Sequence, residues 1–399
     1  MPRLSHLTRI HTTPTEEGST WLQLFFDLVY VAILVEVGYQ LAHNLDMQGI
    51  IKFIILFIPI WWSWLEFVDY GSRYPIDDIG MRVLTVLYMA VMLLLAFEIH
   101  GIYSEENMIV FTLTYALSKF ILAFMYGRAW YHYPTYRRLT SHRAIAFALI
   151  GALWVAISFA APQKLWILIL PIVIGALSPL FIHLVHKFTN RTKLSRPPIK
   201  YQFLLHRFGE LTIIVLGEFF IKLVTSSDGR ELVAINYLIG SFLLIISVSL
   251  WWLYFDHLEH TDLIKSGSRM AVWVYTHFLF LAAITAYGVV GNEIFAVTSF
   301  EALPDAERLL FTIALATAVL SYGVIEWASK ERDEPLSRAP QPLVRLGSAM
   351  ALLAVGFWGT SLNVGWLTGL AAAILLGQVV FGVYTRIQRP DIDKLMATS

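Results

Sequence analysis

Residues 49–69 read GIIKFIILFIPIWWSWLEFVD, and this stretch decides the fold. Apart from Lys52 it holds no charged residue until Glu66, and Asp69 follows at its end. A helix of about 20 apolar residues crosses the roughly 30 Å hydrocarbon core of a bilayer. The stretch therefore predicts a transmembrane helix that ends in two carboxylates near the membrane surface.

The composition extends this expectation to the whole chain of 399 residues. Hydrophobic residues make up 57% and charged residues 15%, against roughly 25% charged in soluble domains. The formal net charge is zero, so nucleic acid is not an expected partner. Cysteine is absent, which excludes disulfides, thiol catalysis and Cys-ligated metal clusters. The lipid bilayer is the expected environment.

The apolar runs predict an all-α, polytopic transmembrane helix bundle with about twelve spans. They lie near 21–43, 49–68, 81–103, 107–127, 143–161, 165–186, 207–226, 234–255, 269–291, 307–328, 343–360 and 362–384. The predicted organisation is an N-terminal segment 1–20, a first half 21–186, a polar linker 187–206, a second half 207–384 and a tail 385–399.

The two halves resemble each other. The pair Trp61-Trp62 recurs as Trp251-Trp252 about 190 residues later, which sets Glu66 against Asp256 and Asp69 against Glu259. Arg82 likewise corresponds to Arg269. Six spans per half give the halves the same direction, so the pattern predicts two parallel six-helix repeats, a design of small-solute transporters.

Lys and Arg indicate the orientation. They concentrate in alternate loops, such as 128–143, 187–207 and 330–345. By the positive-inside rule these loops face the cytoplasm. We therefore expect a multi-pass protein of the cytoplasmic membrane with both termini in the cytoplasm.

Charged side chains inside the spans are the candidate functional groups, because each costs about 2.5–3.5 kcal/mol to insert. Asp27 lies about 9 Å into its span and Glu218 near mid-membrane, at 1.5 Å per helical residue. Desolvated carboxylates can exchange protons near neutral pH. The other candidates for binding an ion, a proton or a substrate lie toward the cytoplasmic half of the bundle; they are Glu66, Asp69, Arg82, Arg207, Glu210, Asp256, Arg269 and His277.

Structural interpretations stand beside these functional ones. Glu218 can pair with Lys222 one turn away, His277 can be a helix–helix hydrogen-bonding residue, and Arg82 or Arg269 can pin helix ends through ion pairs. Gly209, Gly217, Gly288 and Gly291 suggest close approach of helices.

Other site chemistries find little support. His257 and His260 lie among carboxylates, but this segment is typical of a solvated helix end, so we expect no metal site. Neither a nucleotide-binding glycine loop nor a Gly-x-Ser-x-Gly sequence is present. We expect no cofactor.

Several motifs resemble one known family. Residues 24–31 (LFFDLVYV), 61–64 (WWSW), 208–218 (FGELTIIVLGE) and 251–256 (WWLYFD) resemble the bacterial low temperature requirement A family. The similarity extends over about 20–300 and implies a polytopic membrane protein of the bacterial inner membrane, without a settled activity.

The resemblance also implies which positions matter: Asp27, Asp78, Arg82, Glu210, Glu218, His277 and Glu293. The chain departs from the family pattern at two places. Gln23-Leu24 stands where the family usually has Glu-Leu, and His206-Arg207 stands where it tends to have Glu-Arg.

Three function classes remain open. The first is a proton- or cation-coupled secondary transporter of a small solute, in which Asp27 and Glu218 bind the ion or proton. Arg82, Arg207 or Arg269 then pairs with these carboxylates in one state or contacts an anionic solute. The others are a lipid-directed enzyme or lipid mover, with carboxylates and histidines as acid and base, and a cation or proton channel. A homo-oligomer is possible.

Overall fold

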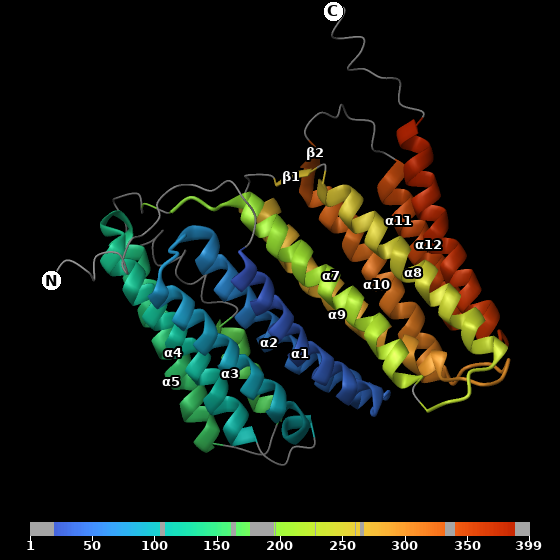
Figure 1. Cartoon of the computed structure of the whole chain (residues 1–399), viewed down its shortest axis with the longest axis horizontal. Coiled ribbons are helices and arrows are strands. Elements are labelled where there is room, and N and C mark those ends of the chain that lie inside the picture. The colour runs from blue at the N-terminus through green and yellow to red at the C-terminus, as the bar shows by residue number, and fades with distance from the viewer. Residues whose placement is uncertain are drawn as a thin grey trace, which may run out of the picture. The chain divides into compact units, whose positions relative to one another are not determined.

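The computed structural model (Figure 1) describes residues 20–103, 108–160, 165–175, 195, 197–227, 229–259, 261–263, 267–331 and 340–387. Within these residues the fold is all-α, apart from one antiparallel pair of three-residue strands. Backbone contacts divide the chain into two compact units, residues 1–214 and 215–399, and the boundary falls inside helix α7.

The first unit is built from long helices that run through apolar sequence, with two short 3-10 turns. The helices are α1 (Trp21–Ala42), α2 (Met47–Arg73), α3 (Ile79–Tyr103), α4 (Met108–His132), α5 (Arg137–Ala160) and the start of α7 (Tyr201–Ser226), and the turns are η1 (Pro134–Tyr136) and η2 (Leu165–Leu168). The Gln23 side chain accepts a hydrogen bond from the Thr20 N–H, and Asp46 accepts one from the Gly49 N–H. These bonds satisfy donors at the starts of α1 and α2.

The second unit continues from α7. It contains α8 (Ala234–Glu259), β1 (Thr261–Leu263), α9 (Gly267–Phe295), α10 (Asp305–Ala328), β2 (Ser329–Glu331), α11 (Pro340–Trp358) and α12 (Val364–Ile387). Within this unit α9 packs on α10, α10 on α11, and α8 on α10. In the first unit α3 packs on α4, α4 on α5, and α2 on α4 in the same order. The first unit also has α1 packed on α3 and on α2, for which no equally extensive contacts of α7 are seen among the described residues, so the repeat stays a prediction.

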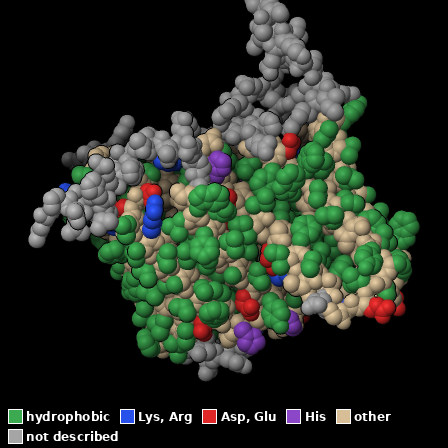
Figure 2. All heavy atoms as spheres, viewed as in Figure 1, with side chains coloured by type: hydrophobic (Ala, Val, Ile, Leu, Met, Phe, Trp, Pro, Cys, Tyr) green, Lys and Arg blue, Asp and Glu red, His purple; other side chains and the backbone are tan. Residues whose placement is uncertain are grey.

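The helix faces that point away from the interior of each unit are apolar, like the faces that point into it. Trp21, Phe97, Phe159 and Trp358 are among many large hydrophobic side chains with high exposure, and hydrophobic side chains cover most of the described surface in Figure 2. Exposed apolar area on this scale is typical of helices that face lipid.

Ten of the described helices are long and apolar enough to cross a membrane, and they lie at ten of the twelve predicted spans. Helix α7 corresponds to the predicted span 207–226 but is outside this set; it carries Arg207, Glu210, Glu218 and Lys222 within 26 residues. The expected span 165–186 is described only to residue 175, where Trp166–Gly175 forms a short apolar helix. Of the predicted linker 187–206, residues 187–194 and 196 lie outside the described residues and α7 begins at Tyr201, so the division there stays a prediction.

Two of the four glycines singled out in the sequence allow helices to approach closely. A Cβ at Gly291 would lie 3.0 Å from the Phe219 ring, and one at Gly288 would lie 3.6 Å from Phe219. Both contacts join α7 to α9 within the second unit. The expectation for Gly209 stays a prediction. The expectation for Gly217 is wrong, because among the described residues no atom outside the backbone of α7 lies within 4 Å of a Cβ placed there.

This difference in packing predicts different changes in stability for two matched substitutions. Gly291→Val should destabilise the protein by about 1–3 kcal/mol, because the added methyl groups overlap the Phe219 ring. Gly217→Val adds the same atoms to open space and should change stability much less. Thermal unfolding of both variants in detergent measures the difference, and equal melting temperatures would contradict the close packing.

Candidate functional site

The centre of the first unit is a fully buried charge pair between α1 and α7. The Arg207 guanidinium donates from Nε to Asp27 Oδ2 at 3.0 Å and from Nη2 to Asp27 Oδ1 at 2.5 Å. Both side chains are 0% exposed. The bond is bidentate and charge-assisted on both sides, which is the strongest hydrogen-bonding arrangement between two side chains. It confirms that one of the three candidate arginines pairs with Asp27.

Helix α2 completes the surroundings of Asp27. The Trp64 indole N–H donates to Asp27 Oδ1 at 2.7 Å. One turn further along α1, the Tyr30 hydroxyl accepts a bond from the Trp64 backbone N–H at 3.3 Å. Phe26 and Phe203 lie against the guanidinium at 5.4 and 5.9 Å from ring centroid to Cζ. Aromatic faces and a carboxylate thus hold the cation in a dry environment.

Arg207 retains hydrogen-bonding capacity beyond Asp27. Its Nη1 has no hydrogen-bond partner among the described residues, although the residue is fully buried. Glu210 lies one turn along α7, with its Oε2 at 3.8 Å from Arg207 Nε. A guanidinium has five N–H donors, so the Nη1 donors can bind a further acceptor.

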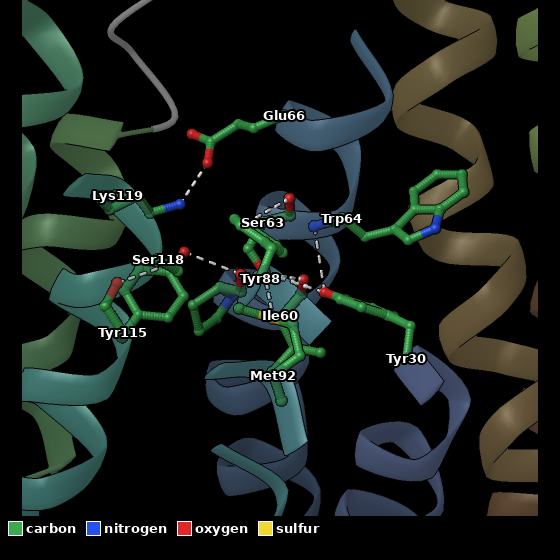
Figure 3. A network of polar contacts seen from close by, with 11 residues as sticks. Tyr30, Ile60, Ser63, Trp64, Glu66, Tyr88, Met92, Tyr115, Ser118 and Lys119 are labelled. Atoms are coloured by element: carbon green, nitrogen blue, oxygen red, sulfur yellow. Dashed lines mark hydrogen bonds and ion pairs between the residues drawn. The ribbon is translucent and has the colours of Figure 1, made fainter. Parts of the chain in front are cut away.

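A second buried pair lies between α2 and α4. Glu66 bonds to the Lys119 ammonium (Figure 3) and also accepts a hydrogen bond from Trp62. Lys119 lies over the Tyr115 ring, 4.4 Å from its centroid. An ammonium in this position needs the carboxylate, because an unpaired buried charge costs several kcal/mol.

Hydroxyl groups link the helices between these two pairs (Figure 3). The Tyr30 and Ser63 hydroxyls are 3.1 Å apart, and Tyr88 donates to the Ser63 carbonyl at 3.0 Å. Tyr88 also bonds to the Ser118 side chain. The chain of bonds runs from α1 through α2 and α3 to α4, so these hydroxyl groups form one connected network across four helices.

The remaining predicted residues of the first unit form separate pairs. Asp69 bonds to Arg73 at 2.8 Å and to Arg143 at 2.9 Å. Arg82 pairs with Asp77 at 3.0 Å, with both side chains more than half exposed. Asp78 bonds to Arg128 and accepts the Met81 N–H at 2.7 Å, which caps the start of α3.

The predicted residues of the second unit have varied partners. Glu218 pairs with Lys222 at 3.0 Å, one turn away on α7. His277 contacts the Tyr254 hydroxyl through Nε2 at 3.0 Å and the Trp273 carbonyl through Nδ1 at 2.7 Å. Arg269 lies over the Trp327 ring. Asp256 and Glu293 are partly exposed on α8 and α9. The side chains of 259–263 lie outside the described residues.

Both members of the Asp27–Arg207 pair are candidates from the sequence, but the partners of Glu66, Asp78 and Asp69 are not. These are Lys119, Arg128 and Arg143, and Trp64 enters the sequence analysis only as part of a motif. A signal existed for Lys119, because a lysine in the middle of the apolar run 107–127 should have a buried anion as its partner. Arg128 and Arg143 resembled ordinary cytoplasmic positive charge.

Ten candidate membrane spans, with ion pairs buried between helices, define an integral, multi-pass membrane protein. Residues 18–382 match the family described as Bacterial low temperature requirement A protein (LtrA). The chain belongs to this family, and the match extends beyond the region around 20–300 in which motifs were found. A comparison with curated proteins gives no match.

The buried pair on α2 and α4 predicts non-additive mutational effects. Glu66→Gln leaves Lys119 buried without its anion and should destabilise the protein by about 3–5 kcal/mol. The double variant Glu66→Gln with Lys119→Met removes both charges and should recover most of that loss. Thermal unfolding in detergent measures both, and a double variant as unstable as the two single changes added together would contradict the pairing.

The cap of α3 predicts a pH dependence. Burial raises the pKa of Asp78, but hydrogen bonds from Arg128 and the Met81 N–H outweigh it, so the pKa lies below its usual value. A lowered folded-state pKa stabilises the protein above the unfolded value of about 3.9, and this contribution is lost as the pH falls through the folded value.

Asp78→Asn should therefore lower the melting temperature at pH 7, and its difference from the native chain should shrink below about pH 4. Asp77→Asn is the matched control, because its ion pair with Arg82 is more than half exposed and should contribute little. A melting-temperature difference for Asp78→Asn that stays constant from pH 7 to pH 3 would refute this account.

Proposed function

We propose that the protein is a proton- or cation-coupled secondary transporter of a small solute in the cytoplasmic membrane, with both termini in the cytoplasm. The observation that carries the proposal is the fully buried Asp27–Arg207 pair between α1 and α7. Buried ion pairs are weak sources of stability, whereas ionisable groups inside a membrane commonly serve ion or solute passage. The family membership and the concentration of Lys and Arg in alternate loops support the location.

Proton or cation binding is coupled to solute binding in this proposal because Asp27 and the solute both bind the Arg207 guanidinium. A proton or cation on Asp27 neutralises the carboxylate and weakens its hold on Arg207. An acceptor group of the solute can then take the released N–H donors. Because the coupling is reciprocal, solute at Arg207 in turn favours neutralisation of Asp27. Transport then requires that the loaded and empty forms differ in which side of the membrane reaches this site.

Glu218 is a weaker candidate for the coupling group than Asp27. Its partner Lys222 lies on the same helix, one turn away, and both side chains are partly exposed. An i,i+4 pair of this kind forms without bringing two helices together, so opening it has no direct consequence for helix arrangement. Asp27 instead holds α1, α2 and α7 through Trp64 and Arg207.

The test uses purified full-length protein in liposomes that contain a pH-sensitive dye. Under an imposed pH gradient, a panel of inorganic ions, organic anions and amino acids is added in turn. We expect one solute class to drive proton movement by the native chain, and Asp27→Asn to slow this movement by about 10- to 100-fold, since it removes the coupling free energy.

Glu66→Gln is the matched control, because it also neutralises a largely buried, paired carboxylate of the same unit. Equal loss in both variants would assign the effect to stability instead of coupling. Glu218→Gln should retain more transport than Asp27→Asn. Proton movement without added solute would favour a channel, and no movement under any condition would overturn the transporter.

A further inference from the structure

A cavity lies at one end of the first unit, beside the buried charge pair. Its volume is about 70 Å³ and it is partly open to solvent, which is room for several water molecules or a small organic molecule on the measure by which one water needs about 10–15 Å³. Its wall includes Gln23 at the start of α1, Tyr74 after α2, Arg82 near the start of α3, and Phe203 and Arg207 near the start of α7.

Two buried donors of this wall lack partners among the described residues. They are Arg207 Nη1 and the Tyr74 hydroxyl. Arg207 is 0% and Tyr74 1% exposed, and leaving such groups without an acceptor costs about 1–3 kcal/mol each. Burial also raises the pKa of Tyr74, so its hydroxyl keeps its proton. Both groups can bind an acceptor placed in the cavity.

The remaining polar lining also favours an acceptor. Residues in the first turns of three helices, α1, α3 and α7, line the cavity, and helix N-termini carry partial positive charge. The Gln23 carbonyl oxygen already accepts from the Thr20 N–H, which leaves its amide donors. The opposing features are the end of α2 and the Asp77 carboxylate, which Arg82 neutralises through two bonds.

Charge and shape limit the ligand further. Arg207 is shared with Asp27, and Arg82 with Asp77, so the wall has donors in excess but little net positive charge. It therefore suits a single negative charge better than a doubly charged phosphate. Phe67, Ile76, Met81 and Phe203 supply an apolar wall beside the donors.

We propose that this cavity binds a singly charged oxyanion on a small apolar body, an organic carboxylate, with Arg207 Nη1 and the Tyr74 hydroxyl as its donors. This assignment deepens the proposed function, because it names the solute class that would compete with Asp27 for Arg207. The phosphodiester of a lipid headgroup has the same charge and is the other source of this chemistry.

Binding of radiolabelled benzoate to the purified full-length chain tests the proposal. The measurement is made by scintillation proximity in lipid-free detergent and carboxylate-free buffer. Arg207 variants also break the Asp27 pair, so Tyr74→Phe is the informative change: it removes one hydroxyl that has no described partner. We expect saturable binding to the native chain and about tenfold weaker binding to Tyr74→Phe, as a bond to a charged group is lost.

Tyr70→Phe is the control, because its hydroxyl donates to the Met125 carbonyl at 3.1 Å and it does not line the cavity. This variant should be less stable but should bind benzoate as the native chain does. Absence of saturable binding, or equal affinity of native and Tyr74→Phe proteins, would overturn the site.

Short-chain phosphatidylglycerol serves as a second probe. If it binds and benzoate does not, the carboxylate assignment is wrong and the lipid is the ligand. The assay contains neither membrane nor gradient, so its outcome is independent of transport. Benzoate binding without any solute-driven proton flux would retain the site and reject the transporter.

Discussion

A charged side chain buried inside a membrane protein needs a partner of opposite charge, and this requirement determines how the helices of the first unit pack against one another. The Asp27–Arg207 bond joins residues 180 positions apart, and the Glu66–Lys119 bond joins residues 53 positions apart. Each of these four side chains would carry a large free-energy cost if it were buried without its partner. The rotation of α1 against α7 and of α2 against α4 is therefore constrained by charge, while apolar packing, which has many near-equivalent solutions, fills the remaining space.

The two units distribute their charges differently despite the repeated sequence. In the first unit the ion pairs at Asp27 and Glu66 connect different helices. In the second, Glu218 pairs within α7 and Arg308 pairs with Asp305 within α10, although Arg345 of α11 does reach Glu326 of α10. Glu66 and Asp256, which the predicted repeat sets against each other, also differ in burial: Glu66 is buried and Asp256 is partly exposed. A helix depends on the apolar length of its sequence, whereas an ion pair depends on a single partner residue, so a repeated motif does not by itself predict a repeated ion pair.

The sequence predicted the helices well because span length and hydrophobicity are local properties. It placed Asp27 and Arg207 among the candidates, since charge inside an apolar run is visible without a structure. It could not choose Arg207 over Arg82 or Arg269, because the choice depends on which helices are neighbours and how each is rotated. Tyr74 could not be predicted from the sequence for a related reason. A tyrosine at a span end is typical of the aromatic belt, and only the packed structure shows that its hydroxyl is buried without an acceptor among the described residues. Gly217 and Gly291 likewise look alike in sequence and differ only in what packs against them.

The position of Arg207 gives the site its discriminating power. One face of the guanidinium is committed to Asp27, and the residue also borders a cavity with an apolar wall. An anion entering that cavity gains the Nη1 donors without first breaking the Asp27 bond, so initial binding does not incur the cost of separating a buried pair. In the proposed transport cycle, neutralisation of Asp27 would then strengthen the binding of an anion that Nη1 already holds. Binding and coupling would be successive events at one side chain, and a neutral molecule of the same shape would gain the apolar wall but not the link to Asp27.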